Sequence, residues 1–461
     1  MNMTTVVLLL LGIGVAAYYA GRSRAERLGG GVGAARNLHS LPGYYGYFTA
    51  IWATLPSFAL LFAWLLLQER FLILIVASRL PQAVRELPAG QLDLFLNTVL
   101  TSAGRPATVP ADPVVASAIE HYLTLLNLSQ WSVALTVCGL AVLGTFLALR
   151  LIHPAFRARN RVEGVIAWFL VAASSIAILT TIGIVLSVFF EALRFFGQVS
   201  LSEFLFGTSW SPQTAIRDDQ IGSSGSFGIV PLLTGTLLIM SIAMLVAIPI
   251  GLMSAVYMAE YSTLRTRAIV KPLLEVLAGI PTVVYGFFAV LSVAPWVRRI
   301  GESLGLEVAS ESALAAGLVM GVMIIPLISS LSDDAIRAVP ASIREGATAL
   351  GATRSETIVG ILLPAAMPGI AGGILLAVSR AVGETMIVVM AAGLAANLTV
   401  NPLEAVTTVT VQIVTLLVGD QEFDSARTLA AFALGLVLFV MTMLLNVLGL
   451  TFVRRYRERY E

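Results

Sequence analysis

Residues 333–364, which lie between two long apolar segments, read DDAIRAVPASIREGATALGATRSETIVGILLP. A set of residues stands at fixed intervals along this stretch: Glu345-Gly346-Ala347, then Gly351 after three residues, then Ile361, Leu363 and Pro364 after nine more. Ile343, Ala347 and Leu350 have the spacing of an apolar stripe on a helix, and Gly351 suits a tight turn at its end. The pattern predicts a short amphipathic helix between two spans, exposed to a partner's groove; an ordinary polar loop is the alternative.

The composition places the chain in a membrane. It has 461 residues, of which 57% are hydrophobic and 12% charged, with mean hydropathy +0.90, which is incompatible with a soluble globular protein. So few charges exclude an extended basic surface for nucleic acid. The chain has one cysteine, Cys138, and three isolated histidines, so a zinc site is not expected. Lys271 is the only lysine and stands in no Gly-Lys-Ser/Thr motif, so the chain has no phosphate-binding loop of its own.

Nine segments have about the 20 apolar residues needed to cross a bilayer. They are residues 4–20, 47–67, 131–152, 164–190, 229–257, 273–296, 313–332, 366–396 and 428–453.

The arginines give these spans an orientation. With 333–364 placed in the cytoplasm, 18 of the 28 Lys and Arg residues fall on inside segments and nine on the longer outside segments. Because cytoplasmic loops carry an excess of Lys and Arg, the sequence predicts an all-α membrane protein with its N-terminus outside and its C-terminus inside.

We expect four parts along the chain. Residues 1–162 form an N-terminal membrane extension of three spans and an outside loop at 79–130. Residues 163–228 form a span followed by an outside amphipathic and polar segment, whose aromatic residues between Leu193 and Trp210 suggest seating at the membrane interface. Residues 229–453 form a core of five spans, and 454–461 form a cytoplasmic tail.

Arg380 and Glu384 are charged residues inside the predicted span 366–396. An intramembrane charge costs about 3 kcal/mol or more on insertion scales, so both should face protein or water. Four residues apart on one helix, they would share a face and be able to pair. One interpretation is an ion pair that fixes helix register. The interpretation we favour places Arg380 beside an anion pathway tuned by Glu384, because a guanidinium binds oxyanions bidentately.

The loop at 333–364 resembles the EAA loop of ABC-importer permeases, with Gly346 at a position where Ala is usual. Further segments are similar to the PstC family of phosphate-specific ABC permeases: Phe204–Trp210, Tyr257–Tyr261, Gly279–Phe288 and Arg380–Met386. From the residues alone, Gly279 and Pro281 could instead mark a kinked helix start, and Glu260-Tyr261 an interfacial anchor. Met386-Ile387 after Gly-Glu-Thr differs from the Ala-Pro usual in the paired PstA family.

The resemblance implies a type I ABC importer permease core in a bacterial inner membrane. It implies a second, PstA-like permease, a PstB-like ATPase dimer and a PstS-like periplasmic phosphate-binding protein as partners. It implies no cofactor on this chain, with ATP and Mg on the ATPase. Arg380, Glu384 and Thr385 would line the substrate path. The residues implied in ATPase coupling are Arg344, Glu345, Gly346, Ala347, Gly351, Ile361, Leu363 and Pro364.

Three other functions stay open at this stage. A permease for another oxyanion such as sulfate would show the same features, since one arginine does not define pocket selectivity. A self-contained ion-coupled carrier is disfavoured by the absence of a detectable inverted repeat. A membrane-embedded enzyme is disfavoured because no His/Asp or Ser/His set converges on any span.

Overall fold

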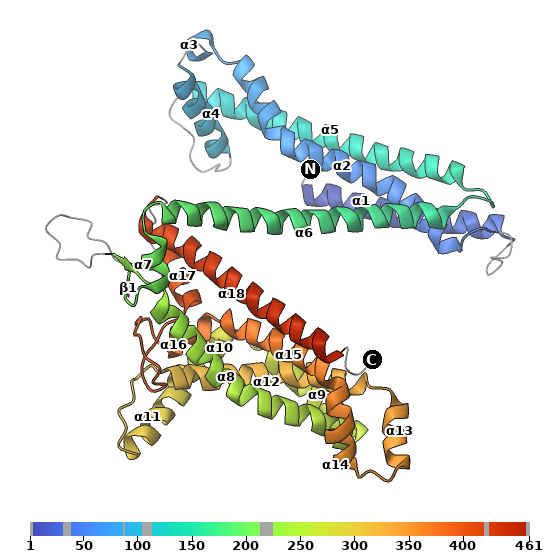
Figure 1. Cartoon of the computed structure of the whole chain (residues 1–461). Helices are drawn as coiled ribbons and strands as arrows, with labels where there is room; N and C mark the ends of the chain where they lie inside the picture. Colours follow the sequence, from blue (N-terminus) through green and yellow to red (C-terminus); the bar gives the residue numbers. More distant parts are fainter. Residues whose placement is uncertain are drawn as a thin grey trace. The chain divides into compact units, whose positions relative to one another are not determined.

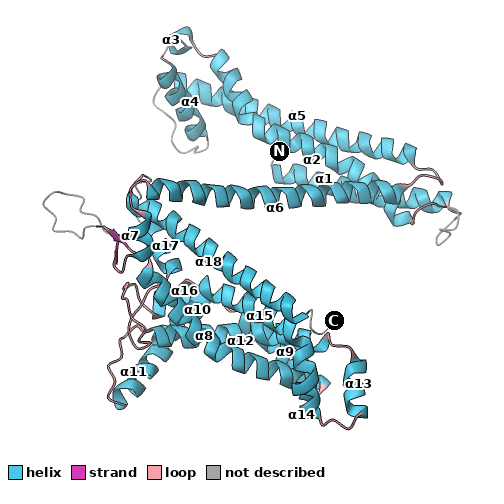
Figure 2. Cartoon of the chain, in the orientation of Figure 1, coloured by secondary structure: helices cyan, strands magenta, loops and turns pink. Residues whose placement is uncertain are grey.

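The computed structural model describes six stretches of the chain: residues 3–30, 38–85, 88–103, 113–212, 225–418 and 424–457. These are almost entirely helical (Figures 1 and 2). Contacts divide the chain into two units, Met1–Leu179 and Thr180–Glu461. In the described stretches nine helices are long and apolar enough to cross a membrane, which confirms the predicted number. The protein is a multi-pass membrane protein.

The first unit is built on three long helices that pack on one another, α1, α2 and α5. Its helices are α1 (Met3–Leu28), α2 (Pro42–Ser78), α3 (Gln82–Arg85), α4 (Ala89–Ala103), α5 (Pro113–Leu151) and the first part of α6 (Ala158–Phe196). Glycine allows the closest approach: a Cβ at Gly144 of α5 would lie 2.3 Å from the Trp52 carbonyl oxygen of α2. The outside loop expected at 79–130 instead contains α3, α4 and the beginning of α5, because a proline is tolerated at a helix start.

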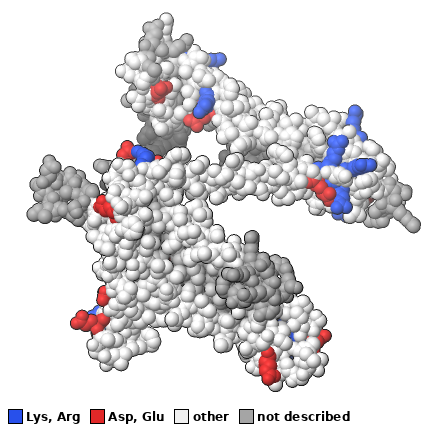
Figure 3. All heavy atoms as spheres, in the orientation of Figure 1, with Lys and Arg blue, Asp and Glu red and all other residues white. Residues whose placement is uncertain are grey.

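One end of the first unit is closed by a compact apolar cluster that joins α1, α2, α5 and α6. Tyr45 and Phe48 of α2 are buried in it with Phe156 and Val162, and the Tyr45 hydroxyl donates to the Phe156 carbonyl oxygen at 3.0 Å. Figure 3 shows basic side chains gathered at this end of the unit. This is the end that the arginine distribution places in the cytoplasm.

The second unit holds the remaining elements. They are α7 (Leu201–Phe206), β1 (Trp210–Ser211), β2 (Ser226–Phe227), α8 (Val230–Val256), α9 (Leu264–Ala278), α10 (Thr282–Phe288), α11 (Ala294–Ser303), α12 (Ala313–Arg337), α13 (Ala341–Ala349), α14 (Arg354–Thr357), α15 (Leu363–Val382), α16 (Met386–Ala391), α17 (Val409–Leu417) and α18 (Ala426–Arg457). Three π-helical turns extend or join these helices: η2 (Tyr257–Tyr261), η3 (Ala289–Val293) and η4 (Ile358–Leu362).

The core of this unit is α12, packed between α8 and α15. Small residues bring the backbones close, as is usual in membranes. A Cβ at Gly321 of α12 would lie 2.9 Å from Cβ of Val246 on α8, and one at Gly369 of α15 would lie 2.6 Å from Cβ of Ala335 on α12. The polar ends of all three helices are thereby held together at the loop that follows α12.

The aromatic segment before α8 lies in the protein core, contrary to the expected interfacial seating. Phe195, Phe204 and Trp210 are buried in one cluster, while Phe206 is exposed. Trp210 pairs with Phe227 across the antiparallel strands β1 and β2, and its indole N–H donates to Gln412 Oε1 at 3.0 Å. The polar segment predicted after it falls partly on residues 213–224, outside the described residues.

Two predicted spans are interrupted. The span expected at 273–296 is divided at Gly279–Pro281, where α9 ends and α10 begins after Pro281. The span expected at 366–396 ends as a helix at Val382, and the short α16 follows. Proline favours a helix start, and Gly383 follows the last helical residue of α15. The division at residue 162 expected from the sequence stays a prediction.

Candidate functional site

The loop predicted to couple the protein to a partner is a helix, a turn and a second helix. α13 runs from Ala341 to Ala349 after Pro340. Gly351 has φ +84°, a left-handed conformation that confirms the predicted turn. Thr353 and Glu356 then form a reciprocal capping box that starts α14, and η4 leads into α15.

The base of this loop packs on the ends of the neighbouring helices. Leu363 lies against a buried cluster that includes Ala255 of α8, Ile336 of α12 and Ile358 of η4. Ile361 and Pro364 are half-buried. Leu363 therefore packs the end of the loop on the helix bundle.

Arg344 of α13 forms an ion pair with a buried carboxylate. Its Nη2 lies 2.8 Å from Oε1 of Glu260, whose side chain is 8% exposed. Arg344 Nη2 also donates to the Ile336 carbonyl oxygen at 3.5 Å. Glu260 stands in η2 at the end of α8, so one arginine connects α13 to both α8 and α12.

A second cation fastens the other half of the loop to the same turn. The guanidinium carbon of Arg354, at the start of α14, lies 4.9 Å from the ring centroid of Tyr261, within cation–π distance. Glu260 and Tyr261 are consecutive in η2. The two contacts hold α13 and α14 on one π-helical turn, and such turns are frequent at functional sites.

A cationic cluster around Asp333 anchors α9 to the end of α12. The Asp333 side chain is fully buried, with Arg267 Nη2 at 2.6 Å, Arg337 Nε at 3.2 Å and Lys271 Nζ at 3.4 Å. Lys271 also donates to Asp334 Oδ1 at 2.9 Å, and this hydrogen bond raises the pKa of Lys271. These ion pairs hold the end of α12, from which the loop begins, against α9.

The outer face of α13 is left free for contact. Ala347 is buried, but Ile343 is 41% exposed and Leu350 is 91% exposed. Glu345 is exposed on the same helix, and a Cβ added at Gly346 would meet no atom within 4 Å. Of the three residues of the predicted apolar stripe, Ala347 is the one that is buried.

Glu384 lies beyond the end of α15, and its carboxylate accepts hydrogen bonds from backbone N–H groups. Its carboxylate Oε1 accepts from the N–H of Met386 at 3.0 Å and of Ile387 at 3.3 Å. Its own carbonyl oxygen accepts from the Thr410 hydroxyl at 2.9 Å, and its side chain is buried. Glu384 therefore caps the N-terminus of α16.

Arg380 stands in the last turn of α15 with its side chain exposed. Among the described residues, no carboxylate lies within ion-pair distance of it, so the pairing with Glu384 allowed by one continuous helix is not formed. The helix ends before Glu384, which separates the two side chains. Arg380 is therefore a cation within the membrane segment that has no carboxylate partner among the described residues.

Two segments of the sequence pattern, Gly279–Phe288 and Arg380–Met386, lie close together at this break. The Tyr285 hydroxyl of α10 donates to the Leu277 carbonyl oxygen at 2.8 Å. α10 packs closely on α16, since a Cβ at Gly286 would lie 3.2 Å from the Met386 carbonyl oxygen. Thr385 lies at the bend, with its hydroxyl 3.4 Å from the Gly383 carbonyl oxygen.

Sequence reasoning missed the partners of two residues. For Glu260 the sequence leaves two interpretations open, an interfacial anchor or part of a family motif, and neither includes its pair with Arg344. Asp333 lies in the loop at 333–364, but the sequence does not indicate its three cationic partners. In both cases partners come from residues distant in the chain.

Two family models match this chain. One, described as a phosphate ATP-binding cassette transporter, matches residues 7–180. The other, described as a binding-protein-dependent transport system inner membrane component, matches residues 247–458.

Known proteins are similar to this chain over more than half of its length. A probable ABC transporter permease protein, YqgH of Bacillus subtilis, is 34% identical over 278 residues, 60% of this chain and 84% of that protein. The phosphate transport system permease protein PstC 1 of Mycobacterium tuberculosis is 33% identical over 277 residues, 55% of this chain and 81% of that protein. This chain belongs to the phosphate-type ABC transporter permeases.

The expectation of a PstC-like permease is thus confirmed. The phosphate transport system permease protein PstA 1 of Mycobacterium tuberculosis is also similar, with 34% identity, but over 50% of this chain and 72% of that protein. The second family match, residues 247–458, begins within α8 and extends past the end of α18 at Arg457, and it contains both the loop at 333–364 and the break at Arg380.

Proposed function

We propose that this permease forms, with a second permease subunit, the path by which phosphate is imported across a bacterial inner membrane. A periplasmic binding protein delivers the phosphate. Separate ATPase subunits hydrolyse ATP with Mg, and this chain binds no cofactor and has no ATPase activity of its own.

The proposal rests on the observation that Arg380 has no carboxylate partner among the described residues. Glu384, the carboxylate nearest to it in the motif, is already used to cap α16, which leaves the guanidinium free to bind an anion. An unpaired charge in a membrane segment costs several kcal/mol unless it serves a water-filled path. A tetrahedral oxyanion with two free oxygens matches the geometry of the guanidinium fork.

The loop α13–α14 supplies the coupling. Leu350 and Ile343 present apolar surface, and Glu345 and Gly346 lie on the same exposed helix, which suits insertion into a groove of the ATPase. Arg344 and Arg354 fasten the loop to η2. A movement of the ATPase would therefore be passed to α8 and α15 rather than absorbed by a flexible loop.

Uptake of labelled phosphate tests the proposal. Cells that lack the chain are compared with cells in which it is restored, with excess unlabelled sulfate as competitor. Restoration of uptake without competition by sulfate supports a phosphate path, whereas uptake that does not depend on the chain refutes it. Competition by sulfate would indicate a permease for a broader class of oxyanions.

The variant Arg380→Gln distinguishes a defect in the phosphate path from a defect in assembly with the ATPase. We expect uptake to be lost while the ATPase still co-purifies with the permease. Arg298→Gln is the matched control, because Arg298 lies outside the proposed path and pairs with the exposed Glu302. Normal uptake by the Arg380 variant would remove Arg380 from the path.

A further inference from the structure

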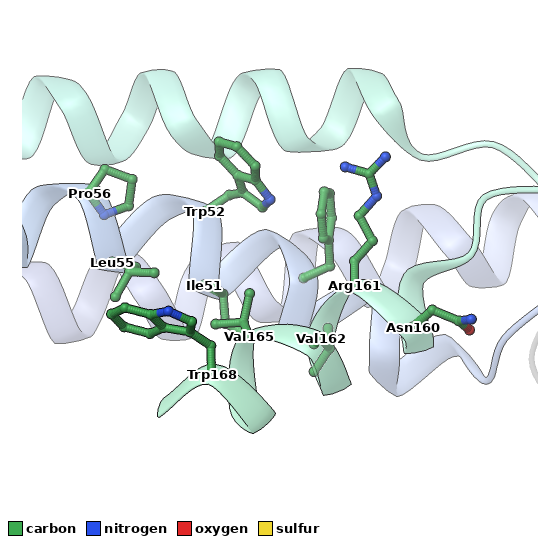
Figure 4. Close-up of a pocket in the computed structure, with 11 residues that line it drawn as sticks. Ile51, Trp52, Leu55, Pro56, Asn160, Arg161, Val162, Val165 and Trp168 are labelled. Atoms are coloured by element: carbon green, nitrogen blue, oxygen red, sulfur yellow. The ribbon is translucent and has the colours of Figure 1, made fainter. Parts of the chain in front are cut away.

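The first unit contains a cavity of about 540 Å³ between α2 and the beginning of α6. Figure 4 shows its two ends: Leu55, Pro56 and Trp168 lie at one, and Arg161 and Asn160 lie at the other. The wall between them is apolar. It consists of Phe48, Ile51, Trp52, Val162, Gly164 and Val165.

The cavity belongs to the cytoplasmic half of the membrane. Arg161 follows Arg157 and Arg159 at the start of α6, the end of the unit that the arginine excess places inside. From Arg161 to Trp168 the helix rises about 10 Å, and one leaflet of the hydrocarbon core is about 15 Å deep. The apolar wall therefore reaches from the interface through about two thirds of the hydrocarbon depth of the leaflet.

Arg161 is the cation that the cavity offers to a ligand. Its neighbour Arg159 is already paired with Glu163 at 2.6 Å. Among the described residues Arg161 has no carboxylate partner, and its guanidinium carbon lies 5.6 Å from the Phe156 ring centroid. The site thus combines a free cation and an amide at the interface with an apolar, tryptophan-lined wall beneath them.

We propose that this cavity binds an anionic glycerophospholipid of the cytoplasmic leaflet. Its headgroup phosphate contacts Arg161 and Asn160, and one acyl chain lies along Trp52 and Val165 towards Trp168. Basic pockets between membrane helices on the cytoplasmic side are suited to anionic headgroups. The inference does not depend on the transported substrate, since every residue involved lies in the first unit.

The surroundings favour a lipid over a protein segment as the occupant. In the most apolar window of α6, no residue is buried by the rest of the chain, as expected of a helix that faces hydrocarbon. Arg161 stands at the interface, which is the depth at which anionic lipids carry their negative charge.

Tryptophan fluorescence gives a direct test, because Trp168 lines the cavity. The full chain in its native assembly is reconstituted in vesicles of phosphatidylglycerol and phosphatidylcholine, with bromine on the acyl chains of one lipid at a time. The Trp168 signal is taken as the difference from Trp168→Phe. We expect brominated phosphatidylglycerol to bind about fivefold better than phosphatidylcholine, the preference given by one arginine at an anionic surface.

Two variants should abolish this preference, each with a matched control. Arg161→Gln removes the cation. Its control is Arg159→Gln: because Arg159 is already paired with Glu163, this change should leave the fivefold preference unchanged. Gly164→Leu adds a side chain to the cavity wall at a position where a Cβ meets no atom within 4 Å. Gly183→Leu is equally free of contacts on α6 but lies outside the cavity.

The outcomes separate the possible occupants. A ratio near one in the unmodified protein, or an unchanged ratio in Arg161→Gln, overturns recognition of the headgroup. An unchanged ratio in Gly164→Leu overturns the cavity as the place of binding. If neither brominated lipid quenches Trp168, a protein segment covers the cavity and the proposal is wrong.

Discussion

Replacement of Arg344 by glutamine should detach the coupling helix from the membrane helices. In the folded chain the Arg344 guanidinium lies 2.8 Å from the Glu260 carboxylate, which is 8% exposed. Glutamine leaves that carboxylate buried without a cation. Removing one partner of a buried pair costs about 3–5 kcal/mol, and we take about 3 kcal/mol because the Arg344 side chain is 33% exposed.

Replacement of Glu260 by glutamine should destabilise the loop less than replacement of Arg344. In Glu260→Gln the guanidinium is left without its anion, but its exposed third regains hydration, so about 1 kcal/mol is expected. In the double variant no buried charge is left unpaired, and the cost should stay near that of Glu260→Gln. The interaction energy from the double-mutant cycle would then be about 3 kcal/mol.

Hydrogen exchange of the α13 amides measures these energies directly, because local opening of the loop exposes them. A loss of about 3 kcal/mol corresponds to exchange roughly 100-fold faster in Arg344→Gln. Glu345→Gln is the control. Glu345 is exposed and forms no ion pair among the described residues, so the α13 amides should exchange at the same rate in this variant as in the unmodified chain. In transport assays Arg344→Gln should hydrolyse more ATP per phosphate imported.

Two results would refute this reasoning. If α13 exchanges at the same rate in Arg344→Gln as in the unmodified chain, the ion pair does not hold the helix. If the double variant shows the sum of the two single effects, Arg344 and Glu260 act independently, and the route from the loop to α8 is not through this pair.

Further predictions concern the loop and its anchor. Asp333→Asn leaves three cations around a buried amide and should lower the free energy of unfolding by about 3 kcal/mol, seen as a lower thermal midpoint, whereas Asp334→Asn, 60% exposed, should cost about 1 kcal/mol or less. Gly351→Ala should cost about 1–2 kcal/mol by forcing a Cβ into the left-handed region, and a thermal midpoint unchanged by it would contradict that conformation. Gly346→Asp has room to fold but places a charge on the docking face, so ATP hydrolysis should no longer be linked to phosphate import; coupled transport would exclude this face from the contact.

The sequence was informative where the physical signal is local. The number of spans follows from apolar length. The helix at 341–349 and the turn at Gly351 follow from apolar spacing and from the steric freedom of glycine.

Prediction from the sequence failed where neighbouring groups compete for one side chain, or where a residue is buried by segments that are distant in the chain. Glu384 sits at helical spacing from Arg380, yet its carboxylate is taken by the amides of Met386 and Ile387, and a helix-period pattern cannot show this. Phe204 and Trp210 look amphipathic in the chain but are buried against Phe227 and Gln412. These partners come from segments far away, so composition alone placed the two side chains at the membrane interface.

The structure also indicates how the loop would act on the proposed phosphate path. α15 begins at Leu363, directly after the coupling loop, and reaches Arg380 in its last turn. Its 20 residues span about 30 Å as one helix. The loop before α15 is fixed to η2 and α12 by the contacts of Arg344 and Arg354, and close packing at Gly369 joins α15 itself to α12. Such a rod transmits a displacement with little loss, because packed interfaces move between discrete arrangements rather than deforming. In the proposed transport cycle, a movement of the coupling helix therefore reaches Arg380 through α15 itself. Weakening the Arg344 contact should reduce the response of uptake to ATP while leaving the affinity for phosphate unchanged.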